Sequence, residues 1–151
     1  MVEFLLVGPL LLLLVGSGIQ LSFLWAGQGA VDTAAHFAAR EFARSARTDP
    51  AAARRAALAR AMAECRNRWG GGIARAAMTF LEISREGTGR PSGIGGTPGC
   101  GEACRVTLRH GVELAVPGIN RFLFALAPVE KMRVGGRYYL VLRATRFVTV
   151  E

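Results

Sequence analysis

The chain has 151 residues and a formal net charge of +8, which leaves room for one small domain beyond any membrane anchor. Its basic residues are almost all arginine, with Lys131 the only lysine, and most of them are dispersed over 40–68 and 105–146 without an interleaved ladder of aromatic residues. The sequence has no helix-turn-helix, zinc-finger or single-strand-binding pattern. The dispersed arginines therefore favour solvated surfaces over a nucleic-acid-binding surface. Attraction of these arginines to anionic lipid headgroups is the weaker alternative.

A long apolar run opens the chain. No charged residue occurs from Phe4 to Ala26, and Gln20 is the only strongly polar residue in that stretch. At about 1.5 Å per residue, a helix of this length crosses roughly 30 Å of hydrocarbon. Glycine and Pro9 inside the run are tolerated better in a transmembrane helix than in a soluble one. The run therefore predicts a transmembrane helix over about 4–26.

Helical periodicity continues beyond the run. Apolar residues recur there at steps of three and four: Val31, Ala34, Ala35, Ala38, Phe42 and Ala46. With no helix breaker as far as Arg47, we expect one long helix over 1–47, which is transmembrane at its foot and an amphipathic stem above. The small residues on its stripe permit close approach of another helix. We expect 48–151 to form a separate head domain.

A second helix is predicted after the stem. Thr48 or Asp49 can cap it, Pro50 suits its first turn, and glycines follow Trp69 and end it. Its expected inner face consists of Ala57, Leu58, Met62 and Cys65.

The residue pattern then changes to that of strands. Alternating or β-rich segments occupy 78–84, 104–110, 111–118 and 138–150, and they predict a small antiparallel sheet in an α+β fold. The glycine-rich segment 87–101 predicts a surface loop; it lacks the Lys-Ser/Thr that a phosphate-binding loop requires. The segment 119–128, with Ile119, Phe122, Leu123 and Leu126, is expected to be a short core helix, and a surface for partner subunits is the alternative.

The sequence offers little for catalysis. It has no HExxH, GxSxG or CxxC motif, and we expect His36 and His110 to be solvated. A metal set of Cys100, Cys104 and His110 would need a fourth ligand, so we predict no catalytic, cofactor or metal site. The three cysteines, Cys65, Cys100 and Cys104, allow one disulfide if the domain is exported, and the pairing stays open.

Glu3 stands at the edge of the apolar run, with no basic residue before it. One interpretation places its carboxylate in the headgroup region, near the positive end of the helix. In the other, it pairs with a cation of a neighbouring subunit, such as a terminal amine. Such a pair would fix the axial register between subunits, because a misplaced partner leaves a charge unpaired in a dry environment.

The N-terminal sequence resembles the TadE-like family, the minor pilins or pseudopilins of tight-adherence (Tad, type IVc) pili. The resemblance rests on Val2-Glu3-Phe4, on Pro9 followed by Leu10–Leu14, and on Ala38-Ala39-Arg40, with further similarity at the Val116-Pro117-Gly118 turn and the closing strand. It implies a single-pass protein of the bacterial inner membrane, with its C-terminal head outside the cytoplasm. It also implies partners among pilin subunits, pilus-assembly membrane proteins and membrane lipid, processing by a prepilin peptidase, and no catalysis.

Two features depart from the family pattern. The family's glutamate is fifth after the cut, whereas Glu3 is third, so either a basic leader and two residues precede Met1 or processing does not apply. The arginines after the span, beginning with Arg40, favour the opposite orientation unless such a leader exists. A second class of function is a secreted binding domain whose signal peptide is cut near 25–30, and a third is a membrane-anchored enzyme.

Overall fold

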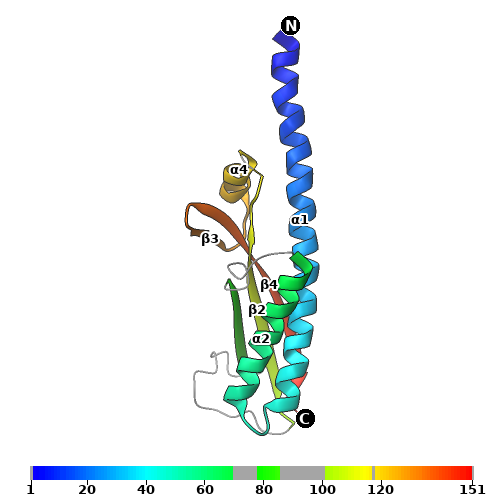
Figure 1. Ribbon diagram of the computed structural model, residues 1–151, viewed down its shortest axis with the longest axis vertical. Helices are drawn as coiled ribbons and strands as arrows, with labels where there is room; N and C mark the ends of the chain where they lie inside the picture. The colour runs from blue at the N-terminus through cyan, green and yellow to red at the C-terminus, as the bar shows by residue number, and fades with distance from the viewer. Residues whose placement is uncertain (1, 70–77, 86–100, 117, 151) are drawn as a thin grey trace.

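The computed structural model describes residues 2–69, 78–85, 101–116 and 118–150, and it confirms the α+β class. In chain order its elements are α1 (Val2–Ser45), α2 (Pro50–Trp69), β1 (Thr79–Arg85), β2 (Ala103–Glu113), α4 (Ile119–Leu126), β3 (Lys131–Val134) and β4 (Arg137–Thr149). Figure 1 shows α1 running the whole length of the molecule, with the remaining elements gathered beside its C-terminal part.

The two long helices form an antiparallel hairpin (Figure 1). Between them, the Asp49 side chain accepts hydrogen bonds from the backbone N–H groups of Ala51 and Ala52, at 2.9 and 3.0 Å. These bonds satisfy two of the N–H groups that the first turn of α2 leaves without helical partners. Of the two caps that the sequence allowed, the structure uses Asp49, and Pro50 opens the helix as predicted.

The four strands form one antiparallel sheet in the order β1-β2-β4-β3. β2 is a single strand of 11 residues that joins two of the predicted segments. β3 was not predicted. It forms a hairpin with β4 through Gly135 and Gly136, whose φ values of 58° and 77° suit a two-residue turn that favours glycine. That Gly-Gly pair is the sequence signal for β3.

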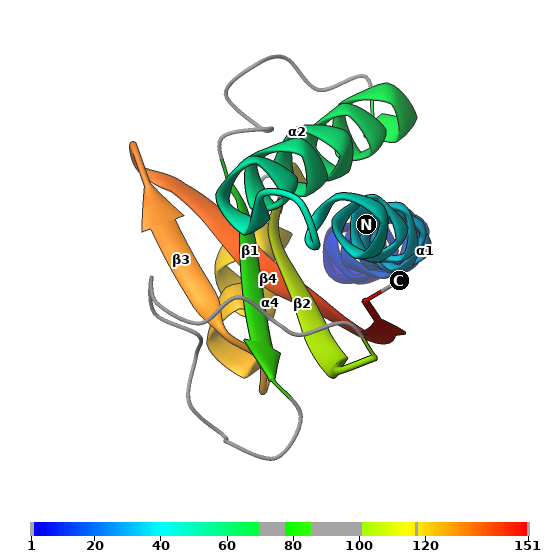
Figure 2. The same ribbon diagram turned by 90° about the horizontal axis from the view of Figure 1, so that it is seen from below.

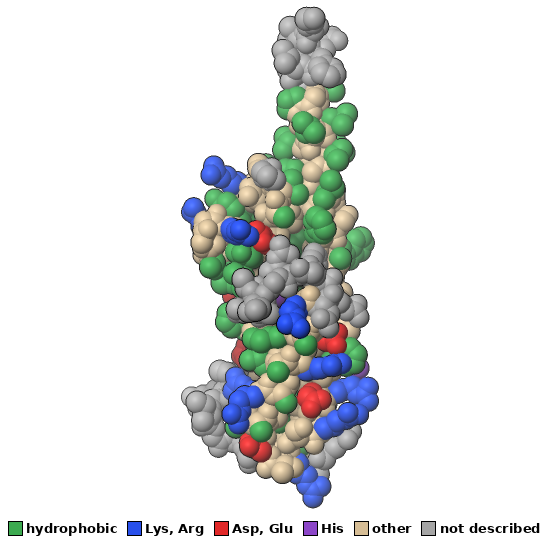
Figure 3. Space-filling model, in the orientation of Figure 1, with side chains coloured by type: hydrophobic (Ala, Val, Ile, Leu, Met, Phe, Trp, Pro, Cys, Tyr) green, Lys and Arg blue, Asp and Glu red, His purple; other side chains and the backbone are tan. Residues whose placement is uncertain are grey.

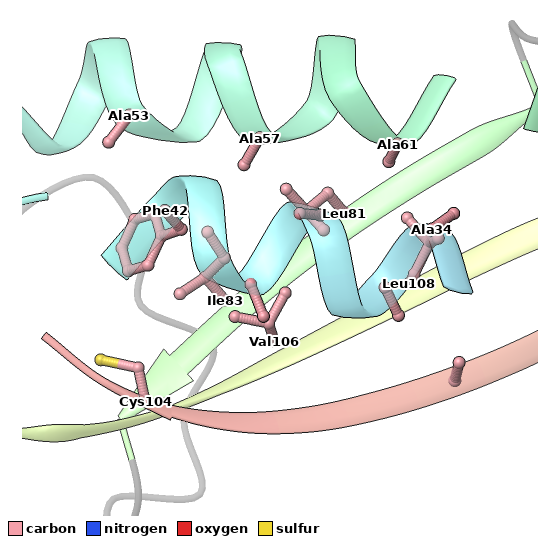
Figure 4. Packing of buried hydrophobic residues seen from close by; sticks show 14 of the residues in the cluster. Ala34, Phe42, Ala53, Ala57, Ala61, Leu81, Ile83, Cys104, Val106 and Leu108 are labelled. Carbon is pink, nitrogen blue, oxygen red and sulfur yellow. The ribbon is translucent and has the colours of Figure 1, made fainter. Parts of the chain in front are cut away.

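The hydrophobic core lies between the helices and one face of the sheet. α1 and α2 lie side by side over this face, as the view along the molecule shows (Figure 2). Ala53, Ala57 and Ala61 of α2 are fully buried against α1, where a methyl side chain allows the two backbones to approach closely (Figure 4). Strand residues including Val106 and Leu108 complete the core from below.

Two predictions, about the burial of His110 and about the burial of the helix after Gly118, are wrong. His110 is buried rather than solvated, because its ring Nδ1 lies 2.9 Å from the Thr79 hydroxyl, which gives the buried imidazole a polar neighbour. The segment after Gly118 does form a helix, but only Ile119 of its apolar residues is buried. Phe122 and Leu126 are 61% and 63% exposed, so α4 is not a core helix.

Candidate membrane anchor and assembly site

The N-terminal part of α1 carries apolar side chains on all its sides. Leu10–Leu14 are five consecutive residues, and each exposes at least half of its side chain. Because successive helical residues are turned by about 100°, five of them cover the whole circumference. On the face seen in Figure 3, this part of the helix is green, and the charged groups lie over the head. We call residues 7–15 the free segment, since the head covers none of its faces.

The next stretch of α1, residues 16–26, touches the head on one side and is exposed and apolar on the other. We call it the shared segment. A Cβ at Gly16 would overlap the Ile119 side chain, so α4 packs directly on the helix backbone there. Around the rest of the circumference Ile19, Leu21 and Trp25 are exposed, Trp25 by 84%. The shared segment therefore presents apolar surface both to the head and to whatever surrounds its exposed sides.

Gln20 holds the head against the shared segment. Its side chain is completely buried. Its Oε1 accepts a hydrogen bond from the Val116 backbone N–H at 3.2 Å, and its Nε2 approaches the Glu113 carbonyl at 3.5 Å. The only strongly polar residue of the predicted span thus serves as a clamp on the chain between β2 and α4. Sequence reasoning missed this role, although an amide inside an apolar run is itself a signal that a buried partner exists.

Two further polar contacts attach β4 to α1. Gln28 Nε2 donates to the Arg143 carbonyl at 3.3 Å. Arg146 forms an ion pair with Asp32 at 3.4 Å, and both side chains are too exposed for the pair to contribute much. Together with Gln20, these residues lie along one side of α1, so the head is fastened to the helix from the shared segment onward.

Hydroxyl groups on α1 are satisfied within the helix. Ser17 donates to the Leu13 carbonyl at 2.7 Å, and Ser22 donates to the Gly18 carbonyl at 2.9 Å. These bonds remove the need for water at two polar side chains of the apolar stretch. By length and composition, α1 fits a single-pass membrane anchor.

The structure places the sequence-derived site residues in different environments. Glu3 lies in the first turn of α1, and its side chain is outside the described part of the structure. The five proposed packing residues are buried inside the chain itself, against α2 and the sheet: Val31, Ala34, Ala35, Ala38 and Phe42. The helix that packs closely against these small side chains is therefore α2 of the same chain.

The predicted disulfide is not supported. Cys65 and Cys104 are both buried, and neither is in a disulfide, while Cys100 lies outside the described residues. Burial raises the pKa of the Cys65 thiol to about 11; the nearby Glu64 carboxylate adds to the rise, and a hydrogen bond with Thr79 opposes it. A protonated, buried thiol is a poor nucleophile, so Cys65 behaves as a small core residue.

A cavity of about 330 Å³ lies on the head between β1 and the β3–β4 hairpin. Arg109 is part of its lining and forms ion pairs with two other lining residues, Glu82 at 3.6 Å and Glu130 at 3.5 Å. The other lining residues are mainly apolar, among them Phe80 and Met132. The lining contains no histidine, cysteine or serine, so it does not provide a nucleophile paired with a base.

The comparison with known proteins finds a match that lies within the N-terminal helix. Residues 1–40 match the family model described as TadE-like protein. The N-terminal segment is TadE-like. No curated protein and no solved structure matches the chain. The match confirms the resemblance of the N-terminal sequence to the TadE-like family, and it covers the free segment, the shared segment and the first part of the stem. Together with the apolar helix, it points to a protein associated with the Tad pilus.

Proposed function

We propose that this chain is a minor pilin or pseudopilin subunit that takes part in assembling or priming a Tad-type (type IVc) pilus. Its α1 would hold it in the bacterial inner membrane, with the head outside the cytoplasm. The observation that carries the proposal is the coincidence of the TadE-like match over 1–40 with a helix whose apolar side chains face outward all round. Such a surface needs lipid or other apolar helices around it.

The attachment of the head supports a retained anchor over a cleaved signal peptide. A cut near 25–30 would remove Gln20 from the chain, leaving the Val116 N–H without its acceptor and Ile119 without its helix surface. It would also sever α1 in the middle of a continuous helix. The alternative of a secreted binding domain would thus expose a strip of the head that α1 now covers.

In the proposed role, the partners are other pilin subunits, pilus-assembly membrane proteins and membrane lipid, and a prepilin peptidase would process the N-terminus. Glu3 would pair with a cation on a neighbouring subunit and so fix the axial register. The proposed function requires surfaces and register rather than catalysis.

A Glu3→Ala variant tests the assembly role. We expect it to stay in the membrane fraction after alkaline carbonate extraction, because the apolar run is intact, but to lose crosslinking to partner pilins. Glu41→Ala is a matched control, since Glu41 is another carboxylate of α1 but lies within the head-covered stem. Normal crosslinking and normal pili in the Glu3 variant would refute the register role, whereas wild-type protein in the soluble fraction would refute the anchor.

A further inference from the structure

One side of α4 is apolar and largely exposed. Phe122 and Leu126 are one helical turn apart, and they expose 61% and 63% of their side chains. Ile119 begins the same side of the helix and packs against Gly16, whereas Phe124 lies on the other side, with its ring centroid 4.8 Å from that of Tyr138. α4 is therefore held by contacts on both sides, and the described residues leave its apolar side beyond Ile119 uncovered.

Cationic residues outnumber carboxylates in α4 and the hairpin that follows it. Residues 118–137 carry four cations, at Arg121, Lys131, Arg133 and Arg137, against one carboxylate, at Glu130. Glu113 pairs with Arg137 at 3.1 Å, and Glu130 pairs with Arg109. Among the described residues, no carboxylate forms an ion pair with the other three cations.

The β3–β4 hairpin that bears two of these cations is attached to α4. Lys131 Nζ donates to the Ala125 carbonyl at 3.0 Å and lies 5.7 Å from the centre of the Phe124 ring. The Arg133 guanidinium lies 5.3 Å from the centre of the Tyr138 ring. We call Arg121, Phe122 and Leu126 of α4, together with Lys131 and Arg133 of β3, the α4 surface.

The α4 surface lies at the end of the head that points toward the free segment (Figure 1). In Figure 3, basic side chains gather at this level beside α1. The views in Figures 1 and 2 show α4 running across α1 rather than along it. A helix that crosses the anchor in this way lies in the plane of a membrane that the anchor spans.

The contact at Gly16 fixes the depth of α4 relative to the anchor. From Gly16 to Trp25 the helix rises by about 14 Å, and its outward side stays apolar over that length. If lipid covered the whole apolar stretch, α4 and its cations would lie about 14 Å inside the hydrocarbon, near the bilayer centre, where charged side chains are costly. Lipid that ends near Gly16 instead leaves α4 resting on the headgroups. That placement brings the α4 surface into contact with the membrane interface.

We propose that the α4 surface is a second membrane-binding site, specific for anionic lipid. Phe122 and Leu126 enter the boundary between headgroups and acyl chains, while Arg121, Lys131 and Arg133 bind lipid phosphates, an arrangement typical of interfacial amphipathic helices. The site rests on the proposed anchoring by α1. It holds the head at a fixed height and orientation above the bilayer.

The test uses the full chain in liposomes and measures quenching of tryptophan fluorescence by brominated lipid. Both native tryptophans are first replaced, by Trp25→Phe and Trp69→Phe. A single reporter is then introduced by Phe122→Trp or, as the matched control, by Phe147→Trp. Phe147 is 58% exposed and has Arg105 5.1 Å from its ring centre, but it lies at the far end of β4. Each reporter is measured in phosphatidylcholine with and without phosphatidylglycerol.

We expect strong quenching and blue-shifted emission for the reporter at position 122 and neither at position 147. Quenching at 122 should increase with phosphatidylglycerol, and Arg121→Gln with Arg133→Gln should weaken the lipid preference by about fivefold for each charge removed. Equal quenching at the two positions in protein that floats with the liposomes would overturn the α4 site alone, and it would favour a protein partner on that surface. Protein that fails to float would overturn the anchor, and the α4 site with it.

Discussion

The clamp at Gln20 offers a sharp test of how the head is attached to α1. Gln20→Glu keeps the shape of the side chain, but it replaces the Nε2 donor that approaches the Glu113 carbonyl with an oxygen. Gln28→Glu is the same change eight residues further along α1, where Nε2 donates to the Arg143 carbonyl. The two sites differ in burial, because the Gln20 side chain is fully buried and that of Gln28 is partly exposed.

The expected magnitude follows from the cost of placing a carboxyl group without water. A buried, unpaired carboxylate is several kcal/mol less stable than a hydrated one. Taking up a proton avoids the charge, and at pH 7 this costs about 4 kcal/mol, since the ordinary pKa of glutamate is about 4.3. We therefore expect Gln20→Glu to destabilise docking of the head by about 3–4 kcal/mol at pH 7 and Gln28→Glu by less than about 1 kcal/mol.

The measurement is urea unfolding of the head in mild detergent micelles, followed by circular dichroism, with limited proteolysis of 114–127 to detect local undocking. The cost of protonation disappears as the pH falls toward 4, because the same carboxyl is then protonated in the unfolded chain too. The Gln20 variant should thus recover most of its stability at pH 4. Equal losses for the two variants, or a loss at position 20 that is unchanged at pH 4, would refute the clamp.

Two further predictions concern the core. Ala57→Leu should lower the free energy of unfolding by about 1–3 kcal/mol, because Ala57 is fully buried between α1 and α2, while Ala51→Leu on the exposed side of α2 should have little effect in the same urea titration. The pKa of Cys65 is raised from 9.0 to about 11, so the folded thiol keeps its proton where the unfolded one loses it, and its contribution to stability should be complete below pH 9 and lost between pH 9 and 11. Cys65→Ala should show a shallower loss of stability across that window in chemical denaturation, and an identical slope would contradict the assignment.

Local pattern was enough to predict the regular elements of this fold. The steps of three and four through Val31 and Phe42 gave the stem, and Pro50 and Trp69 bound the second helix as expected. The alternation around Val106 gave the central strand. In each case the relevant physics acts over a few residues, which is the range that a sequence pattern records.

What the sequence could not give depends on contacts between distant residues. Gln20 meets Val116 across 96 positions, and His110 meets Thr79 across 31. The exposure of Phe122 was missed for a similar reason, because a short apolar helix has the same sequence whether protein or another apolar medium covers it. The small residues around Ala34 were predicted to allow close packing of another helix, but periodicity does not identify which helix packs there.

The division of α1 into two faces has a consequence for the proposed subunit. In the shared segment, the side chains that attach the head, such as Gln20, lie on a different side of the helix from the exposed ones, such as Leu21 and Trp25. Moving from lipid into a bundle of subunits would change the surroundings of the exposed face only. The contacts that fix the head would stay buried throughout, so the head need not refold on transfer. A subunit whose head is attached in this way can move from lipid into a bundle of apolar helices at little cost in free energy. The reason is that lipid tails and helix surfaces are similarly apolar surroundings for a leucine side chain.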